Sequence, residues 1–465
     1  MVVFGGVRGS GEEWYSDVWY FDLATKAWAK EEGCNGAGAE DTARGARPSA
    51  RAGHAAAHLT PRDAGPTSAD ASGGSTRSGS SAGAAADTDA GAVGEERETE
   101  ATDANKPAPY ADVGTMIVFG GCDSDGVLLN DLWTFEYASA AWHCASSAAR
   151  RAGGAGGDDS RRGASVSGTA PTAREGAAMV VANEGAGEAS TDGGDVYLYG
   201  GAGSGGQCLD DLYCLRTRSS GSKGETPQQQ AWTWQRVDFG GSAGPGRRFL
   251  HTMCAVNGQL HVWGGASASS STGGGRRQEA VDTGSICDTV LFSFNVAENT
   301  WSRSAAPSSS PDPPLPPGGA APPPTSIVQR RCGHSCTVVS GGAALLFFGG
   351  LAVNGSVSND LVLCKLATRH AARPVWSKLA VTGGAPALEP RFGHAACFHK
   401  RSGQVLFFGG ETASDTLGSV AVVRVDEQPR AALFVAFIAI LVVAYFLFIY
   451  CKVTGVLGEG QTRLT

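Results

Sequence analysis

Arginine and histidine recur in a short motif along this chain of 465 residues, with the arginine three positions before the histidine. Four copies read Arg-x-x-His, and a fifth carries Ala177 in place of the histidine. The copies run from Arg51 to His54, Arg174 to Ala177, Arg248 to His251, Arg331 to His334 and Arg391 to His394. A guanidinium group can bind a carboxylate through two parallel hydrogen bonds, and an imidazole can bind a metal ion. The motif could therefore serve an acidic partner or a metal.

The histidines do not predict a metal site, because metal ligands must converge on one point and these occupy equivalent positions of separate copies. The 12 cysteines include no Cys-x-x-Cys pair. Cys332 and Cys336 would lie about 13 Å apart along one strand, too far for a disulfide. Gly201 to Gly206 is rich in glycine, but the residues after it are typical of a strand, whereas a phosphate-binding loop needs a helix there. We therefore expect each histidine to be a hydrogen-bonded structural residue, and we expect no metal and no cofactor.

The motif belongs to a longer repeat, which is complete in residues 331–376. There the motif is followed by an apolar run ending in Gly-Gly, an Asx turn, an alternating run and Trp376. Short apolar runs bounded by turn residues favour strands over helices. The Gly-Gly pairs are Gly5-Gly6, Gly120-Gly121, Gly200-Gly201, Gly264-Gly265, Gly349-Gly350 and Gly409-Gly410. The tryptophans that close the repeats are Trp28, Trp142, Trp234 (or Trp232), Trp301 and Trp376.

This order of signals resembles the kelch repeat, and the resemblance covers most of residues 1–426 apart from inserts. It implies an all-β fold, a kelch-type β-propeller of about six blades with the first and last incomplete. It also implies that the arginines line the mouth of a central channel, where Arg51, Arg174, Arg248, Arg331 and Arg391 could grip a carboxylate-bearing partner. The alternative is that these arginines brace neighbouring blades. Galactose oxidase is a related propeller enzyme, but its two tyrosine and two histidine copper ligands cannot be matched here.

We expect one repeat domain over residues 1–426, because repeats bury their faces against their neighbours. The first copy begins at its second strand, without the Arg-x-Gly-His strand, and we expect an incomplete N-terminus. Segments poor in large apolar residues cannot offset the entropy of ordering. They predict disordered inserts near residues 60–112, 148–170, 266–285 and 303–326. The last of these is rich in proline and could also bind a proline-recognising module.

The segment from Ala431 to Cys451 carries no charged residue and is rich in Leu, Ile, Val and Phe. About 20 such residues cross a hydrocarbon core of roughly 30 Å as a helix. We therefore predict a transmembrane α-helix over 431–451, in contact with the lipid bilayer, and a short tail over 452–465. The protein would then be a single-pass membrane protein.

Two topologies stay open for this membrane protein. The positive charges flanking the apolar segment are nearly balanced, and no signal peptide is visible. A type I protein with a missing signal peptide would place the repeats outside the cytosol, and Asn354 of the sequon Asn354-Gly355-Ser356 could then be glycosylated. A tail-anchored protein would place them in the cytosol.

The composition narrows the function further. A net charge of -8 and the lack of a basic, aromatic-lined stripe predict no nucleic-acid partner. We expect a membrane-anchored platform that binds protein partners through propeller loops and the channel mouth, with an oligomeric state that the sequence does not define. Two alternatives stay open: an enzyme with its site at the channel mouth, and a structural spacer at a surface or in a lumen.

Overall fold

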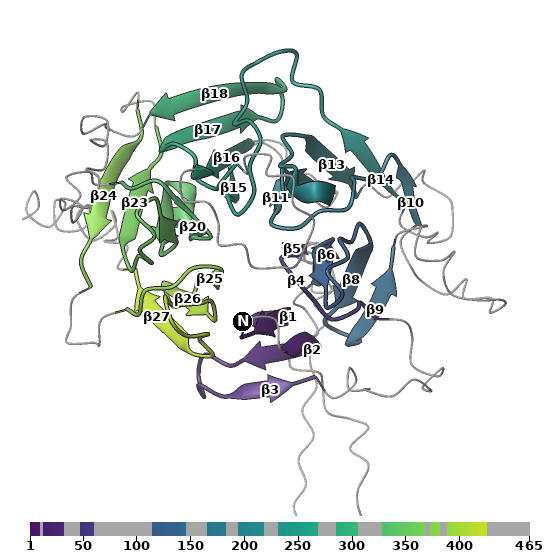
Figure 1. The fold of residues 1–465 in the computed structure, drawn as a ribbon, viewed down its shortest axis with the longest axis horizontal. Helices are drawn as coiled ribbons and strands as arrows, with labels where there is room; N and C mark the ends of the chain where they lie inside the picture. The colour runs from purple at the N-terminus through teal and green to yellow at the C-terminus, as the bar shows by residue number, and fades with distance from the viewer. Residues whose placement is uncertain are drawn as a thin grey trace, which may run out of the picture. The chain divides into compact units, whose positions relative to one another are not determined.

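The computed structural model describes residues 1–9, 13–31, 47–59, 114–145, 165–182, 194–217, 231–267, 285–305, 328–367, 373–381 and 388–425. Within these ranges the fold is all-β, and six sheets of three to five strands follow one another in chain order. We call these sheets blades 1 to 6 (Figure 1). Two single turns of 3-10 helix, η3 (Ser204–Gly206) and η5 (Ser340–Gly342), lie in loops. The six-bladed, all-β prediction is confirmed.

The chain divides into two compact units. The first comprises Met1–Gly333 and Leu351–Ser356 and holds blades 1 to 4. The second comprises His334–Gly350 and the residues from Val357 onward and holds blades 5 and 6.

Blades 1 and 2 are antiparallel sheets whose strands follow chain order. Blade 1 consists of β1 (Val2–Arg8), β2 (Glu13–Phe21) and β3 (Trp28–Lys30). Blade 2 consists of β5 (Ala55–Leu59), β6 (Thr115–Phe119), β8 (Leu132–Glu136) and β9 (Ala141–Cys144). Two short strands flank the inner hairpin of blade 2: β4 (Arg51–Ala52) comes before β5, and β7 (Cys122–Asp123) comes after β6. They pair with each other as an antiparallel ladder. As the sequence predicts, blade 1 has no first strand among the described residues.

Blade 3 has five strands. Its four antiparallel strands are β11 (Ala178–Ala182), β12 (Asp195–Tyr199), β13 (Leu212–Arg216) and β14 (Ala231–Arg236). The fifth, β10 (Ser165–Gly168), pairs in parallel with the outer strand β14. Residues 165–168 lie within the predicted disordered insert 148–170, and for these residues the prediction was wrong. They lack bulky side chains, but the edge of β14 provides backbone hydrogen-bond partners for them.

Blade 4 consists of β15 (Thr252–Val256), β16 (Gln259–Trp263), β17 (Val290–Asn295) and β18 (Thr300–Ala305). Its first hairpin turns at Asn257 and Gly258, which both have positive φ, as an Asn-Gly turn requires. A short ladder of β19 (Arg331–Cys332) and β22 (Leu351–Ala352) completes the first unit. In Figure 1, β15 to β18 lie side by side in chain order.

The second unit holds two antiparallel sheets. Blade 5 consists of β20 (Ser335–Val339), β21 (Ala344–Phe348), β23 (Leu361–Lys365) and β24 (Val375–Leu379). Blade 6 consists of β25 (Ala395–His399), β26 (Gln404–Phe408) and β27 (Val420–Arg424). Among the described residues no fourth strand extends blade 6, in agreement with its missing tryptophan.

Apolar side chains fill the spaces between neighbouring blades within each unit. Ile117 and Phe119 of blade 2 pack with Leu198 and Trp234 of blade 3, and the opposite face of blade 3 packs against blade 4. In the second unit, the rings of Phe348 and Phe407 from blades 5 and 6 lie 4.2 Å apart between centroids. The strands β6, β12, β16 and β21 are therefore buried on both faces, which explains their nearly continuous apolar sequences.

The Gly-Gly pairs let the backbones of adjacent blades approach closely. Gly200 has a φ of 62°, and a Cβ atom there would lie 2.6 Å from the carbonyl oxygen of Arg248. Gly120 has a φ of 64°, and its Cβ would lie 2.7 Å from the carbonyl oxygen of Arg174. Glycine is required at both positions, because any other residue would be strained at positive φ and its Cβ atom would collide with the neighbouring carbonyl oxygen.

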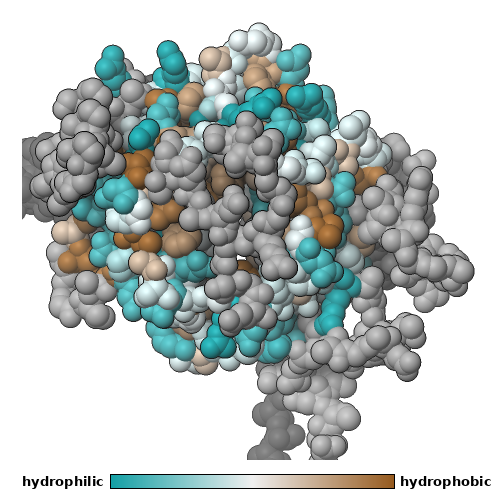
Figure 2. Space-filling model, in the orientation of Figure 1, coloured by the Kyte–Doolittle hydropathy of each residue, from teal (hydrophilic) through white to brown (hydrophobic). Residues whose placement is uncertain are grey.

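Several predicted features lie outside the described residues: nearly all of the inserts at 60–112, 148–170, 266–285 and 303–326, the apolar segment 431–451 and the tail 452–465. Among the described residues, no helix is long and apolar enough to cross a membrane. Figure 2 shows hydrophobic residues dispersed among hydrophilic ones on one face of the molecule. The large hydrophobic residues that are well exposed in the described ranges are Val127, Val375 and Val381.

Candidate functional site: the arginine sockets

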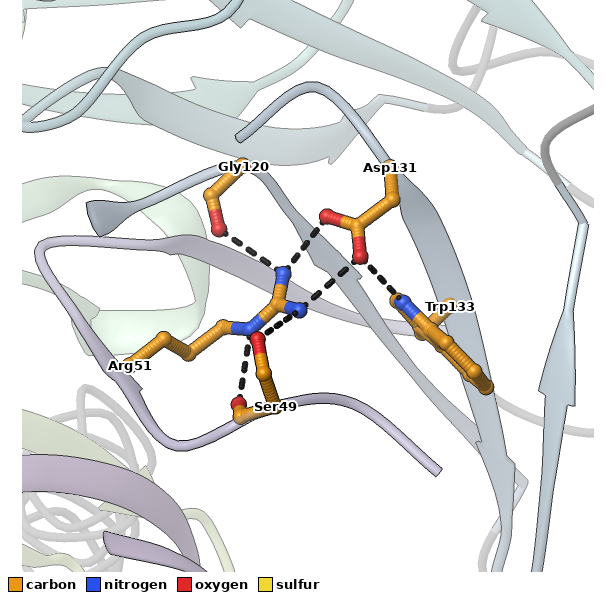
Figure 3. Close-up of polar contacts among 5 residues, drawn as sticks. All are labelled: Ser49, Arg51, Gly120, Asp131 and Trp133. Atoms are coloured by element: carbon orange, nitrogen blue, oxygen red, sulfur yellow. Dashed lines mark hydrogen bonds and ion pairs between the residues drawn. The ribbon is translucent and has the colours of Figure 1, made fainter. Parts of the chain in front are cut away.

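Arg51 lies in a buried socket made by two strands and a loop of blade 2 (Figure 3). Its side chain is 1% exposed and pairs with Asp131 through Nη1 at 2.6 Å and Nη2 at 2.9 Å. Nη1 also donates to the carbonyl of Gly120, while Nε and Nη2 donate to the backbone and hydroxyl oxygens of Ser49. The indole of Trp133 donates to the same carboxylate at 2.6 Å. The guanidinium is thus fully satisfied inside its own blade.

Arg174 lies in an equivalent socket in blade 3. Nη1 and Nη2 donate to Asp211 at 2.5 and 3.0 Å, and Nη1 donates to the carbonyl of Gly200 at 2.9 Å. Thr172 takes the place of Ser49, accepting from Nε and Nη2. The guanidinium carbon lies 5.6 Å from the ring centre of Tyr213, close enough for a cation–π interaction.

Arg248 in blade 4 has no carboxylate at the equivalent position. The aromatic residue beside its guanidinium is Phe292. In blade 3 the aspartate Asp211 lies two residues before the aromatic residue Tyr213. The residue two positions before Phe292 is Val290, which has no charge. The guanidinium instead donates to three backbone carbonyls, those of Pro245, Gly246 and Gly264. Backbone dipoles therefore hold a cation that is 3% exposed.

Arg391 in blade 6 combines backbone and side-chain acceptors with a more distant carboxylate. Nη1 donates to the carbonyl of Gly409 at 3.1 Å, and Nη2 to the hydroxyl of Ser419 at 3.3 Å. The Glu389 carboxylate lies 3.5 Å away and is largely exposed. Burial lowers the pKa of Arg391, and Glu389 opposes this shift. Arg331 is also 1% exposed, and its Nε donates to the carbonyl of Gln329.

Three of the histidines that follow the arginines, His54, His251 and His394, contact the preceding blade and are uncharged at neutral pH. Burial and the nearby arginine of the same motif lower the pKa of His54 to about 4 and those of His251 and His394 to about 3. The His394 Nε2 atom lies 2.8 Å from the hydroxyl of Ser335. Within the described ranges, no three His, Cys, Asp or Glu side chains are grouped so as to hold a metal.

The structure places all five predicted arginines in buried positions, 1 to 3% exposed. The hydrogen bonds of Arg51, Arg174, Arg248 and Arg391 lie within each arginine's own blade. Partner binding and bracing between neighbouring blades both stay predictions.

The carboxylates of Asp131 and Asp211 are site residues that were not predicted, although both aspartates lie in the Asx turn before the third strand of their repeat. The sequence signal that could have identified these aspartates is their constant spacing: an aromatic residue, Trp133 or Tyr213, follows each of them by two positions.

The other predicted site residues have the following places. Trp28, Trp142, Trp234, Trp301 and Trp376 each lie on the outermost antiparallel strand of their blade. Asn354 is exposed in the loop after β22, where its side-chain oxygen accepts from the backbone and hydroxyl of Ser356.

Repeated sheets, Gly-Gly approaches and buried arginines fit the blades of a β-propeller. Residues 158–321, which contain blades 3 and 4, match the family model described as the KLHDC2/KLHL20/DRC7 Kelch-repeats domain. No curated protein gives a significant match. The match confirms the kelch-repeat prediction for residues 158–321.

Proposed function

We propose that this protein is a membrane-anchored platform that binds partner proteins through its blade loops. The observation that carries the proposal is the kelch-repeat match over blades 3 and 4, because kelch domains commonly bind proteins. The sockets of blades 2 and 3 support it physically, because Arg51 and Arg174 each bond to residues at both ends of the loop that begins at the Gly-Gly pair. Loops held on a rigid scaffold are a common place for recognition.

The five arginines have two roles in this proposal. Arg51, Arg174, Arg248, Arg331 and Arg391 fix the loop conformations, and their positive charge favours an acidic partner segment near the loop ends. The first role is supported by the burial of all five side chains and by the loop contacts of Arg51 and Arg174. The second rests on the predicted cationic grouping of the motif.

The test for partner binding uses exposed loop residues, because substituting a buried arginine would unfold a blade. Val127 follows β7 and Gln207 follows η3, and both are exposed. Partners captured by the full-length protein should be lost with Val127→Asp or Gln207→Arg. Glu298→Lys changes an exposed residue at the opposite end of blade 4 and should leave capture intact. Equal capture by all three variants would refute binding through the loops and would favour a spacer.

The membrane anchor is the second part of the proposal. It is supported by the uncharged, apolar residues 431–451, which match the thickness of a bilayer as a helix. The full-length protein should stay with membranes in alkaline carbonate, whereas a variant ending at residue 426 should be released. Release of both forms would refute the anchor.

Protease protection of the blades in intact vesicles decides the topology. Protection together with a glycan that is lost in Asn354→Gln would show a lumenal or extracellular propeller. Accessible, unmodified blades would show a cytosolic propeller.

A further inference from the structure

Two cysteines from neighbouring blades lie against the same short segment of the chain, residues 265–266, which follows β16. Cys208 belongs to the blade 3 loop that contains η3, and its Sγ atom lies 3.9 Å from the carbonyl oxygen of Ala266. Cys287 belongs to blade 4, and its backbone N–H donates to the carbonyl of Gly265 at 2.8 Å. Both cysteines are thiols in the structure, and they contact adjacent peptide groups.

The side chain of Cys287 is directed toward blade 3. Its neighbour Ile286 pairs with Ala266 and packs with Cys332 in a small apolar cluster. Successive side chains of an extended chain point to opposite sides, so Cys287 points away from Ile286. Burial raises the pKa of Tyr199 in blade 3, and the charge of Cys287 contributes to this shift. The thiol of Cys287 is therefore close to blade 3, which also carries Cys208.

The two thiols differ in how easily a reagent reaches them. Cys208 is 3% exposed, whereas Cys287 is only partly buried. Burial raises the pKa of Cys287, the guanidinium of Arg248 opposes this shift, and Asp288 and Cys208 add to it. Cys287 is thus the accessible thiol, with a cation beside it that favours its thiolate, and Cys208 is a buried thiol nearby.

Cys332 is a competing partner for Cys287. Its side chain is 1% exposed, and burial raises its pKa to about 12, with a contribution from Cys287. A thiol with this pKa supplies very little thiolate at neutral pH. It also packs with Ile286, on the side away from which Cys287 points. Cys208 is therefore the expected partner.

We propose that Cys208 and Cys287 are an oxidation site, at which a disulfide reagent or a disulfide of another protein converts the two thiols into a cross-link between blades 3 and 4. The Cys287 thiolate attacks one sulfur of the oxidant, forms a mixed disulfide and releases a thiolate. Cys208 then loses its proton and attacks the Cys287 sulfur, which releases the second thiolate of the oxidant. Two protein thiols become one disulfide, and the oxidant becomes two thiols, which take up the two protons.

This cross-link would tie the blade 3 loop that contains η3 to blade 4. Disulfides persist in oxidising compartments and are rare in the cytosol. The bond should therefore be present in a lumenal or extracellular propeller and absent from a cytosolic one. The proposal concerns the state of two thiols, so it goes beyond the proposed function and does not depend on it.

The probe is a series of glutathione buffers with increasing ratios of disulfide to thiol, applied to the full-length protein in detergent. After the remaining thiols are alkylated and the protein is digested, mass spectrometry should detect two peptides joined through Cys208 and Cys287. Their yield should rise with the ratio. Cys208→Ser and Cys287→Ser should each abolish the joined peptides, and Cys332→Ala is the matched control that should leave their yield unchanged.

Urea unfolding of the same samples gives a second readout. The oxidised wild type should have a higher midpoint than the reduced wild type, because the cross-link constrains the unfolded chain. This difference should vanish in Cys208→Ser. Four results would overturn the proposal: no cross-link in any buffer, a bond between Cys287 and Cys332, a persistent mixed disulfide of Cys287 with glutathione, or a cross-link that forms only in urea.

Discussion

Asp211 and Arg174 are joined by two parallel hydrogen bonds of 2.5 and 3.0 Å, and the arginine side chain is completely buried. The pair links the beginning of blade 3 to its third strand, 37 residues further along the chain. Its neighbour Asp210 lies one residue away but makes only an exposed, 3.9 Å contact with Arg247. Asp211 therefore neutralises a buried charge, whereas its neighbour Asp210 makes a weak contact at the surface.

Asp211→Asn should destabilise the protein by about 3–5 kcal/mol, because it leaves a buried guanidinium without its counter-charge. Asp210→Asn is the matched control and should change stability by less than about 0.5 kcal/mol, as expected for an exposed pair. Urea unfolding followed by tryptophan fluorescence measures both. Similar midpoints for the two variants would contradict the structural role assigned to the socket.

Gly200→Ala should destabilise blade 3 more than Gly205→Ala. Both glycines have positive φ, at 62° and 71°, so both variants carry the backbone penalty of about 1–2 kcal/mol. Only at Gly200 would the new Cβ lie 2.6 Å from the carbonyl of Arg248, whereas nothing lies within 4 Å of a Cβ at Gly205. Thermal unfolding should show a larger decrease in melting temperature for Gly200→Ala than for Gly205→Ala. Equal decreases would show that the close approach of the two backbones at Gly200 does not contribute to stability.

Acid should weaken the protein through its buried histidines. The pKa values of His251 and His394 are lowered to about 3 and those of His54 and His261 to about 4, mainly by burial. Unfolded histidine takes up a proton near pH 6.5, whereas these folded side chains do not. Their stabilisation is therefore complete above about pH 6.5 and is lost as the pH falls toward 4, at up to about 1.4 kcal/mol per pH unit for each histidine.

Urea midpoints between pH 7.5 and 5 test this expectation, with His251→Gln as the comparison. The variant should show a shallower decline with pH than the wild type over the same range. An identical slope would mean that His251 titrates alike in the folded and unfolded chains.

Trp301→Ala should cost about 3–5 kcal/mol, as for other large buried aromatic residues. Its ring lies between Phe294 at 5.0 Å and Tyr199 at 5.6 Å, measured between centroids, and so joins blade 4 to blade 3. The indole N–H has no hydrogen-bond partner among the described residues. Trp301→Phe should therefore cost much less than Trp301→Ala, and chemical denaturation of both variants measures the difference.

The strands and their order could be predicted from the sequence because the same short sequence patterns recur in each repeat. Phe347-Phe348-Gly349-Gly350 and its equivalents mark the end of the second strand, and the tryptophans mark the last. These signals act within a few residues, so no long-range information is needed to place them. The six blades follow from counting them.

The chemistry of the sockets was less predictable, because it depends on contacts between distant residues. Nothing in the sequence around Arg248 shows that Val290 has replaced the aspartate that its equivalents contact. Likewise, Arg51 and Asp131 are 80 residues apart, so their pairing becomes visible only when β4 and β8 are in place. The parallel strand β10 was missed for the same reason, since its pairing partner β14 begins more than sixty residues later.

The strand β10 also changes how blade 3 presents itself to other molecules. The hydroxyls of Ser167 and Thr233 lie 2.9 Å apart on this added strand and its neighbour, so the rim of the sheet is both paired and polar. The strand β10 is now the edge strand of blade 3, because no further described strand pairs with it. It is only four residues long and largely polar, and short edge strands of this kind disfavour the addition of a strand from another chain. The longer and more apolar strand β14 is thereby moved away from the edge along which β-rich proteins can begin to aggregate.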